Sequence, residues 1–257
     1  MSNRINELFA RKNEKILSVF YTAGFPKLND TKEIAMQLES TGADMIEIGI
    51  PFSDPIADGP TIQESNKVAL ENGMNVLLLL QQVKVIRQSV QLPILLMGYL
   101  NPVLQYGLEK FIKDAADAGV DGLILPDLPL DEYLDSFKDK MESAGLINTF
   151  LISPTTSEER IRKIDGASSG FIYAVSSSST TGTRQAFTAE QEAYFKKLTD
   201  MKLTNPFLIG FGVSNSEAFK AVCKYASGAI VGSAFINLLK NSSNLSKDIK
   251  QFITDLK

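Results

Sequence analysis

Eight short apolar runs alternate with segments of helical periodicity, and this alternation constrains the fold more than any other feature of the chain. The runs are almost continuously apolar, as expected for parallel strands buried on both faces, and they cover residues 16–21, 45–49, 93–98, 122–125, 147–152, 170–175, 206–210 and 228–231. Helical patterns between them include residues 31–40, 108–118, 131–144, 157–164, 190–201 and 216–224. Strands that alternate with helices predict parallel βαβ units.

The number of strands and the chain length favour a closed barrel over an open sheet. A TIM (β/α)8 barrel typically needs about 250 residues, and this chain has 257. An open doubly wound sheet normally carries a glycine-rich nucleotide motif after its first strand, whereas residues 21–26 read Tyr-Thr-Ala-Gly-Phe-Pro. Because no linker or compositional break divides the chain, we expect one barrel domain over residues 1–257. An additional amphipathic helix is expected at residues 2–13, and a final helix after Asn241.

Composition argues against several classes of protein. A net charge of −4 without a concentrated block of Lys or Arg argues against a nucleic-acid partner. The apolar runs are far shorter than the roughly 20 residues that span a bilayer, and the N-terminal residues lack the apolar core of a signal peptide. The single cysteine, Cys223, permits no intramolecular disulfide. We therefore expect a cytoplasmic protein that binds neither nucleic acid nor membrane.

Two absences narrow the possible chemistry. The chain has no histidine, which removes imidazole catalysis and most transition-metal sites, so we expect no metal. None of the eight apolar runs contains a lysine, which a Schiff-base aldolase would need on a barrel strand. Carboxylates, tyrosines and backbone groups remain to perform any reaction.

The segment 44–60 carries an unusual set of acids. It reads Asp-Met-Ile-Glu-Ile-Gly-Ile-Pro-Phe-Ser-Asp-Pro-Ile-Ala-Asp-Gly-Pro. Glu47 lies inside the apolar strand, where burial would raise its pKa towards neutrality. It is also consistent with a solvent-facing residue or a structural ion pair. The loop that follows contains Asp58 and several prolines that fix its shape, which favours a functional site.

Glycine turns after the last two expected strands predict a phosphate site. Residues 210–214 read Gly-Phe-Gly-Val-Ser, and Gly232 and Ser233 open another helical stretch. Glycines let a backbone approach a ligand closely, helix N-termini bind anions, and the loops after the seventh and eighth strands of such barrels frequently hold phosphate. The alternative is that these glycines are ordinary turns and caps. Two such turns at the correct strand ends favour phosphate.

The run from Glu47 through Gly-Ile-Pro-Phe-Ser-Asp-Pro-Ile-Ala-Asp-Gly-Pro at residues 49–60 closely resembles the signature of the tryptophan synthase alpha subunit family. The resemblance extends over essentially the whole chain. It implies retro-aldol cleavage of indole-3-glycerol phosphate to indole and glyceraldehyde 3-phosphate. It implies Glu47 as general acid/base and an ionised Asp58 that accepts a hydrogen bond from the indole N–H. Further substrate-binding residues implied by the resemblance are Phe20, Tyr99, Tyr173, Thr181, Gly182, Phe211, Gly212, Gly232 and Ser233.

The same resemblance implies a lid and a partner. Residues 176–187 match the family's mobile lid, but 179–182 read Ser-Thr-Thr-Gly where the family commonly has Gly-Val-Thr-Gly. This departure bears on the flexibility and seating of the lid. Family members bind a beta subunit that contains pyridoxal phosphate and receives indole through a tunnel, in an α2β2 heterotetramer, while the alpha chain itself carries no cofactor. Pro51 and Asp54 are then candidates for the subunit interface.

Two other functions fit parts of the pattern. An isomerase or epimerase of another phosphorylated metabolite would share the phosphate site but not the loop with Glu47 and Asp58. A regulatory subunit that binds ligand only to activate its partner would not need this acid pair. The acid pair therefore favours the lyase.

Overall fold

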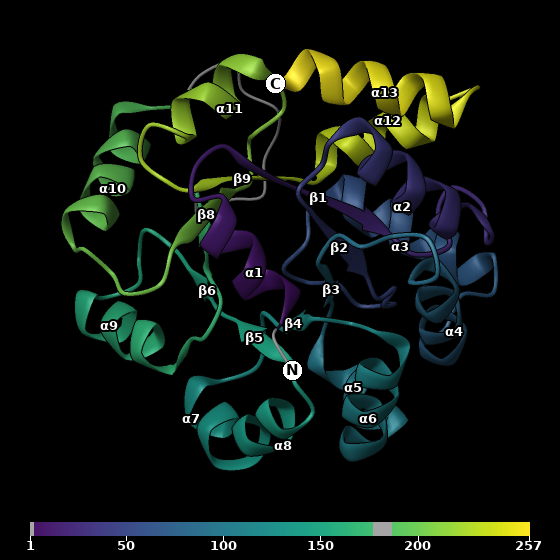
Figure 1. Cartoon of the computed structure of the whole chain (residues 1–257), viewed down its shortest axis with the longest axis horizontal. Coiled ribbons are helices and arrows are strands. Elements are labelled where there is room, and N and C mark those ends of the chain that lie inside the picture. The colour runs from purple at the N-terminus through teal and green to yellow at the C-terminus, as the bar shows by residue number, and fades with distance from the viewer. Residues whose placement is uncertain (1–2, 177–186) are drawn as a thin grey trace.

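The protein is a barrel of parallel strands surrounded by helices (Figure 1). The structure is a computed structural model, which describes residues 3–176 and 187–257. The strands follow the order β5-β4-β3-β2-β1-β9-β8-β7-β6, and every neighbouring pair is parallel. They are β1 (Ile16–Thr22), β2 (Met45–Gly49), β3 (Ile94–Met97), β4 (Gly122–Ile124), β5 (Ile147–Thr149), β6 (Leu151–Ile152), β7 (Ile172–Val175), β8 (Phe207–Gly210) and β9 (Gly228–Val231).

The described residues form nine strands rather than the eight expected, because the fifth expected strand is interrupted at Phe150. Its two parts, β5 and β6, are the two ends of the strand order and are consecutive along the chain. The Phe150 carbonyl accepts a hydrogen bond from the Tyr173 N–H at 2.9 Å, so β7 stays paired across the interruption. One broken strand thus closes the sheet, and the expected (β/α)8 barrel is confirmed.

Helices follow most strands and cover the outside of the barrel. They are α1 (Arg4–Arg11), α2 (Asp30–Thr41), α3 (Pro60–Glu71), α4 (Val76–Ile86), α5 (Leu100–Tyr106), α6 (Leu108–Ala118), α7 (Leu130–Glu132), the π-helical η1 (Tyr133–Phe137), α8 (Lys138–Ser143), α9 (Glu158–Ala167), α10 (Ala189–Asp200), α11 (Ser216–Val222), α12 (Ser233–Asn241) and α13 (Leu245–Leu256). The segment expected as one helix at 131–144 is built from α7, η1 and α8 in succession. Among the helices described here, none is both long and apolar enough to cross a membrane.

The additional N-terminal helix closes one end of the barrel. In Figure 1, α1 crosses the centre of the ring of strands. Ile5 and Leu8 of α1 are buried in the same apolar cluster as Ile16 and Met45, which are the first residues of β1 and β2. Because α1 covers the N-terminal ends of the strands, the opposite, C-terminal ends are left to form the site, as is usual in this architecture.

Candidate active site

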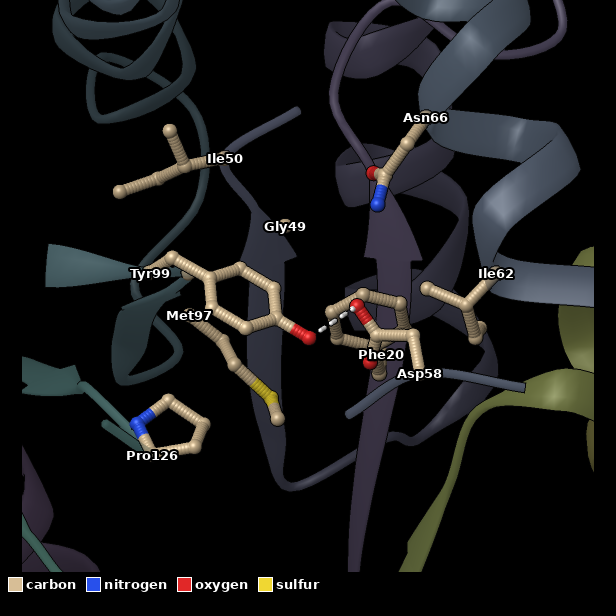
Figure 2. A pocket seen from close by; sticks show the side chains of 10 residues that line it. Phe20, Gly49, Ile50, Asp58, Ile62, Asn66, Met97, Tyr99 and Pro126 are labelled. Atoms are coloured by element: carbon tan, nitrogen blue, oxygen red, sulfur yellow. Dashed lines mark hydrogen bonds between the residues drawn. The ribbon is translucent and has the colours of Figure 1, made fainter. Parts of the chain in front are cut away.

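A pocket lies at the C-terminal end of the barrel, beside the loop that follows β2. Figure 2 shows Asp58 and Tyr99 pointing towards each other across it. The Tyr99 hydroxyl donates a hydrogen bond to Asp58 Oδ2 at 3.2 Å and accepts one from the Ala57 N–H at 2.9 Å. Tyr99 thereby fixes the end of the loop. The lining residues are Phe20, Gly49, Ile50, Asp58, Ile62, Asn66, Met97, Gly98, Tyr99 and Pro126.

Asp58 is a carboxylate at neutral pH. Burial raises its pKa to about 6, while the hydrogen bond from Tyr99 opposes that rise by stabilising the charged form. Burial and the neighbouring Asp58 in turn raise the pKa of Tyr99, so the phenol keeps its proton and remains a donor. The pair presents a negative charge to the pocket at pH values above about 6.

Glu47 lies inside the barrel. Phe20, Glu47 and Leu95 are register partners on β1, β2 and β3. Leu95, and Met45 two residues before Glu47, belong to the buried cluster inside the barrel, so the pleat directs Glu47 inwards as well. Its side chain is 0% exposed. Oε1 accepts a hydrogen bond from Ser18 Oγ at 2.7 Å, and Oε2 has no hydrogen-bond partner in the part of the chain that the structure describes.

The interior position gives Glu47 the opposite protonation state from Asp58. Burial raises the pKa of Glu47 to about 8, and the hydrogen bond from Ser18 opposes part of that rise. At neutral pH Glu47 is therefore mainly protonated, while Asp58 is mainly ionised. Two carboxyl groups whose environments separate their pKa values in this way can act as an acid and a charge-stabilising group in one reaction.

Tyr173 is a buried residue whose pKa is affected by both acids. Its pKa is raised well above the ordinary value by burial and then by the nearby charges of Glu47 and Asp58. The Tyr173 hydroxyl lies directly over Gly210, where an added Cβ would overlap it. The Tyr173 and Phe211 rings meet edge to face with centroids 6.1 Å apart. Tyr173 is thus a neutral phenol that both carboxyl groups influence.

The Phe20 ring connects the acid end of the site with the expected phosphate end. A Cβ added at Gly49 would lie 2.7 Å from Phe20 Cζ, and one added at Gly232 would lie 3.5 Å from Phe20 Cδ1. Gly49 is the next residue after Glu47 on the inner face of β2. Phe20 therefore covers the inner face just beyond Glu47, which is consistent with the complete burial of that carboxyl group.

The expected phosphate residues follow two paired strands, β8 and β9. Gly212 is exposed and adopts φ +80°, which favours glycine. Phe211 adopts φ +64°, and its carbonyl accepts a hydrogen bond from Ser176 Oγ at 2.6 Å. Gly232 caps α12, Ser233 begins it, and the first turn of this helix contains no acidic residue. The N–H groups at this helix end are available to an anion.

The remaining candidates from the sequence are two lid residues and two interface residues. Thr181 and Gly182 lie outside the described residues. Pro51 is buried and Asp54 is exposed, while Ile56 between Asp54 and Asp58 is 89% exposed.

Ser18 was not among the residues expected from the sequence, although a lone serine on the inner face of an apolar strand is the signal that would have found it. Within residues 3–176 and 187–257, no group of three or more His, Cys, Asp or Glu side chains is placed to hold a metal ion.

A closed parallel barrel with a pocket at the C-terminal strand ends, mainly apolar but lined by the Asp58 carboxylate, is the architecture of a (β/α)8-barrel enzyme. Residues 7–257 match the tryptophan synthase alpha chain family. The tryptophan synthase alpha chain of Flavobacterium psychrophilum is 55% identical over 251 residues, which cover 97% of this chain and 99% of that protein.

Solved structures agree with the sequence match. The alpha subunit of tryptophan synthase from Legionella pneumophila strain Paris has a TM-score of 0.90 at 34% identity, covering 100% of this chain and 97% of the other. The tryptophan synthase complex from Pyrococcus furiosus contains a chain with a TM-score of 0.87 at 32% identity, covering 95% and 98%. The protein belongs to the tryptophan synthase alpha chain family, the lyase subunit that cleaves indole-3-glycerol phosphate.

The raised pKa of Glu47 predicts a pH-dependent stability difference between the protein and its Glu47→Gln variant. Because the folded state holds the Glu47 proton and the unfolded state releases it, the folded protein loses stability as pH rises from 4.5, the ordinary value, to about 8. Glutamine mimics the protonated acid and lacks this loss. The free energy of unfolding of Glu47→Gln, relative to the parent, should increase by a few kcal/mol (order of magnitude) across this range. Urea denaturation at several pH values measures this difference, and a pH-independent result would contradict the raised pKa of the buried Glu47 carboxyl group.

Proposed function

We propose that Glu47 is the general acid/base and Asp58 the charge-stabilising carboxylate of indole-3-glycerol phosphate cleavage in this chain. The observation that carries the proposal is the difference in their surroundings: Glu47 is fully buried inside the barrel, whereas Asp58 lines the pocket and accepts a hydrogen bond from Tyr99. This difference separates their pKa values, to about 8 for Glu47 and about 6 for Asp58. The first gives a proton donor at neutral pH, and the second gives a negative charge beside the pocket.

The reaction proposed for Glu47 begins with proton donation. The Glu47 carboxyl group transfers its proton to C3 of the indole ring, and the ring nitrogen becomes positively charged as the C2–C3 π electrons form the new C–H bond. Asp58 accepts a hydrogen bond from the indole N–H and stabilises this charge. The charge-stabilising role requires Asp58 to be ionised, which holds above about pH 6.

Bond cleavage then restores the acid. The hydroxyl group on the carbon attached to C3 loses its proton to the Glu47 carboxylate, and its oxygen forms the aldehyde carbonyl. The electrons of the C–C bond return to the ring and neutralise the nitrogen. The products are indole and glyceraldehyde 3-phosphate, and Glu47 has given one proton and regained one.

Substrate binding is proposed for the residues around these acids. Phe20, Tyr99 and Phe211 would form the walls around the indole ring, with Tyr173 orienting the substrate. Gly212, Gly232 and Ser233 would hold the phosphate through backbone N–H groups and the end of α12, with Thr181 and Gly182 closing the site. The order of these groups, from Asp58 past Phe20 to Gly232, supports a substrate that lies across the mouth.

A beta-subunit partner is proposed from the relatives. The Pyrococcus furiosus structure is a tryptophan synthase complex, which supports an assembly of alpha and beta subunits for this chain too. We propose an α2β2 heterotetramer in the cytoplasm, in which the beta subunit carries pyridoxal phosphate and converts the indole to L-tryptophan. The exposure of Asp54 and Ile56 supports the loop after β2 as part of this interface, with the buried Pro51 at the start of the loop. Residues 1–257 would act as one domain.

Glu47→Gln should lower kcat for indole release by at least about 100-fold, because the amide neither donates nor regains the proton. Binding of glyceraldehyde 3-phosphate should be retained, since the proposed phosphate-binding residues follow β8 and β9 and begin α12, away from Glu47 on β2. An indole-release assay on the purified chain, with and without a beta subunit, measures the first quantity and calorimetry the second. Turnover close to that of the parent protein would remove Glu47 from this role.

Asp58→Asn should lower kcat by about 100-fold while leaving the fold intact, because the pocket loses a negative charge but keeps a side chain of the same size. In the parent protein, activity should also fall as pH drops below about 6, where Asp58 becomes protonated. The asparagine variant should lack this acidic limb. A variant that is mainly unfolded by circular dichroism, or one that keeps both its rate and the limb, would assign Asp58 a structural role instead.

A further inference from the structure

Ser18 is a buried polar residue in contact with the Glu47 carboxyl group. Its side chain is 0% exposed, and its hydroxyl donates to Glu47 Oε1 at 2.7 Å. On β1 it lies two residues from Ile16 and two from Phe20, so it belongs to the face that points into the barrel. A buried hydroxyl is costly unless it is hydrogen-bonded, and here the partner is the carboxyl group.

The hydrogen bond makes the two carboxyl oxygens different. Oε1 is held by Ser18, whereas Oε2 is buried and has no hydrogen-bond partner in the described chain. A buried polar atom left unpaired in a folded protein requires an explanation.

We propose that Ser18 is a positioning residue for the lyase reaction: it fixes Glu47 Oε1 and so leaves Oε2 as the atom that exchanges the proton with indole C3 and the substrate hydroxyl. The inference rests on the proposed role of Glu47. It adds a residue that contacts no reacting atom and acts through the carboxyl group.

The hydrogen bond also serves both halves of the reaction. Glu47 must donate a proton and then accept one, so neither its charged nor its neutral form can be strongly preferred. Burial alone favours the neutral acid, while the Ser18 hydroxyl stabilises the carboxylate and lowers the pKa. Ser18 thereby makes it easier for Glu47 to form the carboxylate that the second half of the reaction requires.

Other titratable groups near Glu47 would remain in place when Ser18 is changed. They are Tyr173 on β7, whose phenol responds to the charges of both acids, and Asp58 on the loop after β2. The partners of Glu47 in register on the adjacent strands, Phe20 and Leu95, are apolar. A change in Glu47 titration caused by Ser18→Ala therefore reports the lost hydroxyl.

The test compares Ser18→Ala with a matched buried serine. Ser65 Oγ shares a hydrogen bond of 2.7 Å with Thr22 Oγ1, is also 0% exposed, and bonds no carboxyl group among the residues that the structure describes. The carboxyl group of Glu47 is followed by carbon NMR on protein labelled at glutamate carboxyl carbons, with Glu47→Gln identifying the resonance. The kcat, KM and pH profile of indole release are measured on the same proteins.

Ser18→Ala should raise the midpoint of the Glu47 titration by about one pH unit. The alkaline limb of kcat/KM should move upwards by the same amount, and kcat should fall about tenfold with little change in KM. Ser18→Thr, which keeps the hydroxyl, should restore the limb, and Ser65→Ala should leave it unmoved. Ser18→Cys, a weaker donor of similar size, should shift the midpoint in the same direction and serves if Ser18→Ala fails to fold.

Two results would overturn the proposal in distinguishable ways. An unmoved Glu47 titration, with Ser18→Ala and Ser65→Ala losing similar stability, would make Ser18 merely structural. A shifted titration together with an active Glu47→Gln variant would show that the carboxyl group is not the proton carrier, and the proposed role of Glu47 would fail with it.

Discussion

The burial of one carboxyl group inside a closed barrel is the constraint on which the site depends. Glu47 is held there by the parallel register of β1, β2 and β3, and its oxygen is fixed by Ser18. The helix α1 closes the barrel below it with Ile5 and Leu8. Desolvation in this closed interior raises the pKa of Glu47 to about 8, so a side chain that is ordinarily a carboxylate is an acid at neutral pH.

The second acid, Asp58, belongs to the same strand–loop unit but has a less buried environment. Asp58 lies in a pocket, accepts a hydrogen bond from Tyr99, and is ionised above about pH 6. The Tyr99 hydroxyl also accepts a hydrogen bond from the Ala57 N–H. One phenol therefore positions both the end of the loop and the Asp58 carboxylate. The two acids differ in burial rather than in chemistry, and in the proposed mechanism this difference provides both an acid and a charge-stabilising carboxylate in a chain without histidine.

Sequence patterns predicted the barrel and the glycine turns, because the first depends on alternating strand and helix patterns and the second on the backbone freedom of glycine. The pattern alone left Glu47 open between a buried acid, a solvent-facing residue and a structural ion pair, and the structure shows a buried acid. The interruption at Phe150, which divides the fifth strand, follows from closing the sheet and leaves no signal in a continuously apolar run. The helix α4 lay outside the named helical patterns because its leucine run obscures the periodicity. The bonds from Ser18 to Glu47 and from Tyr99 to Asp58 join residues 29 and 41 positions apart. Such contacts depend on strand register and loop closure, which periodicity does not specify.

Neutron diffraction from crystals grown at neutral pH in heavy water would locate the exchangeable hydrogens on Glu47 and Asp58 and so determine which of the two acids is protonated. Deuterium is expected on Glu47, at the Oε2 atom that Ser18 leaves unpaired, and none on Asp58, with the Tyr99 deuterium directed at Asp58 Oδ2. A bare Glu47 carboxylate, or a deuterated Asp58, would show that burial does not give the two acids different protonation states.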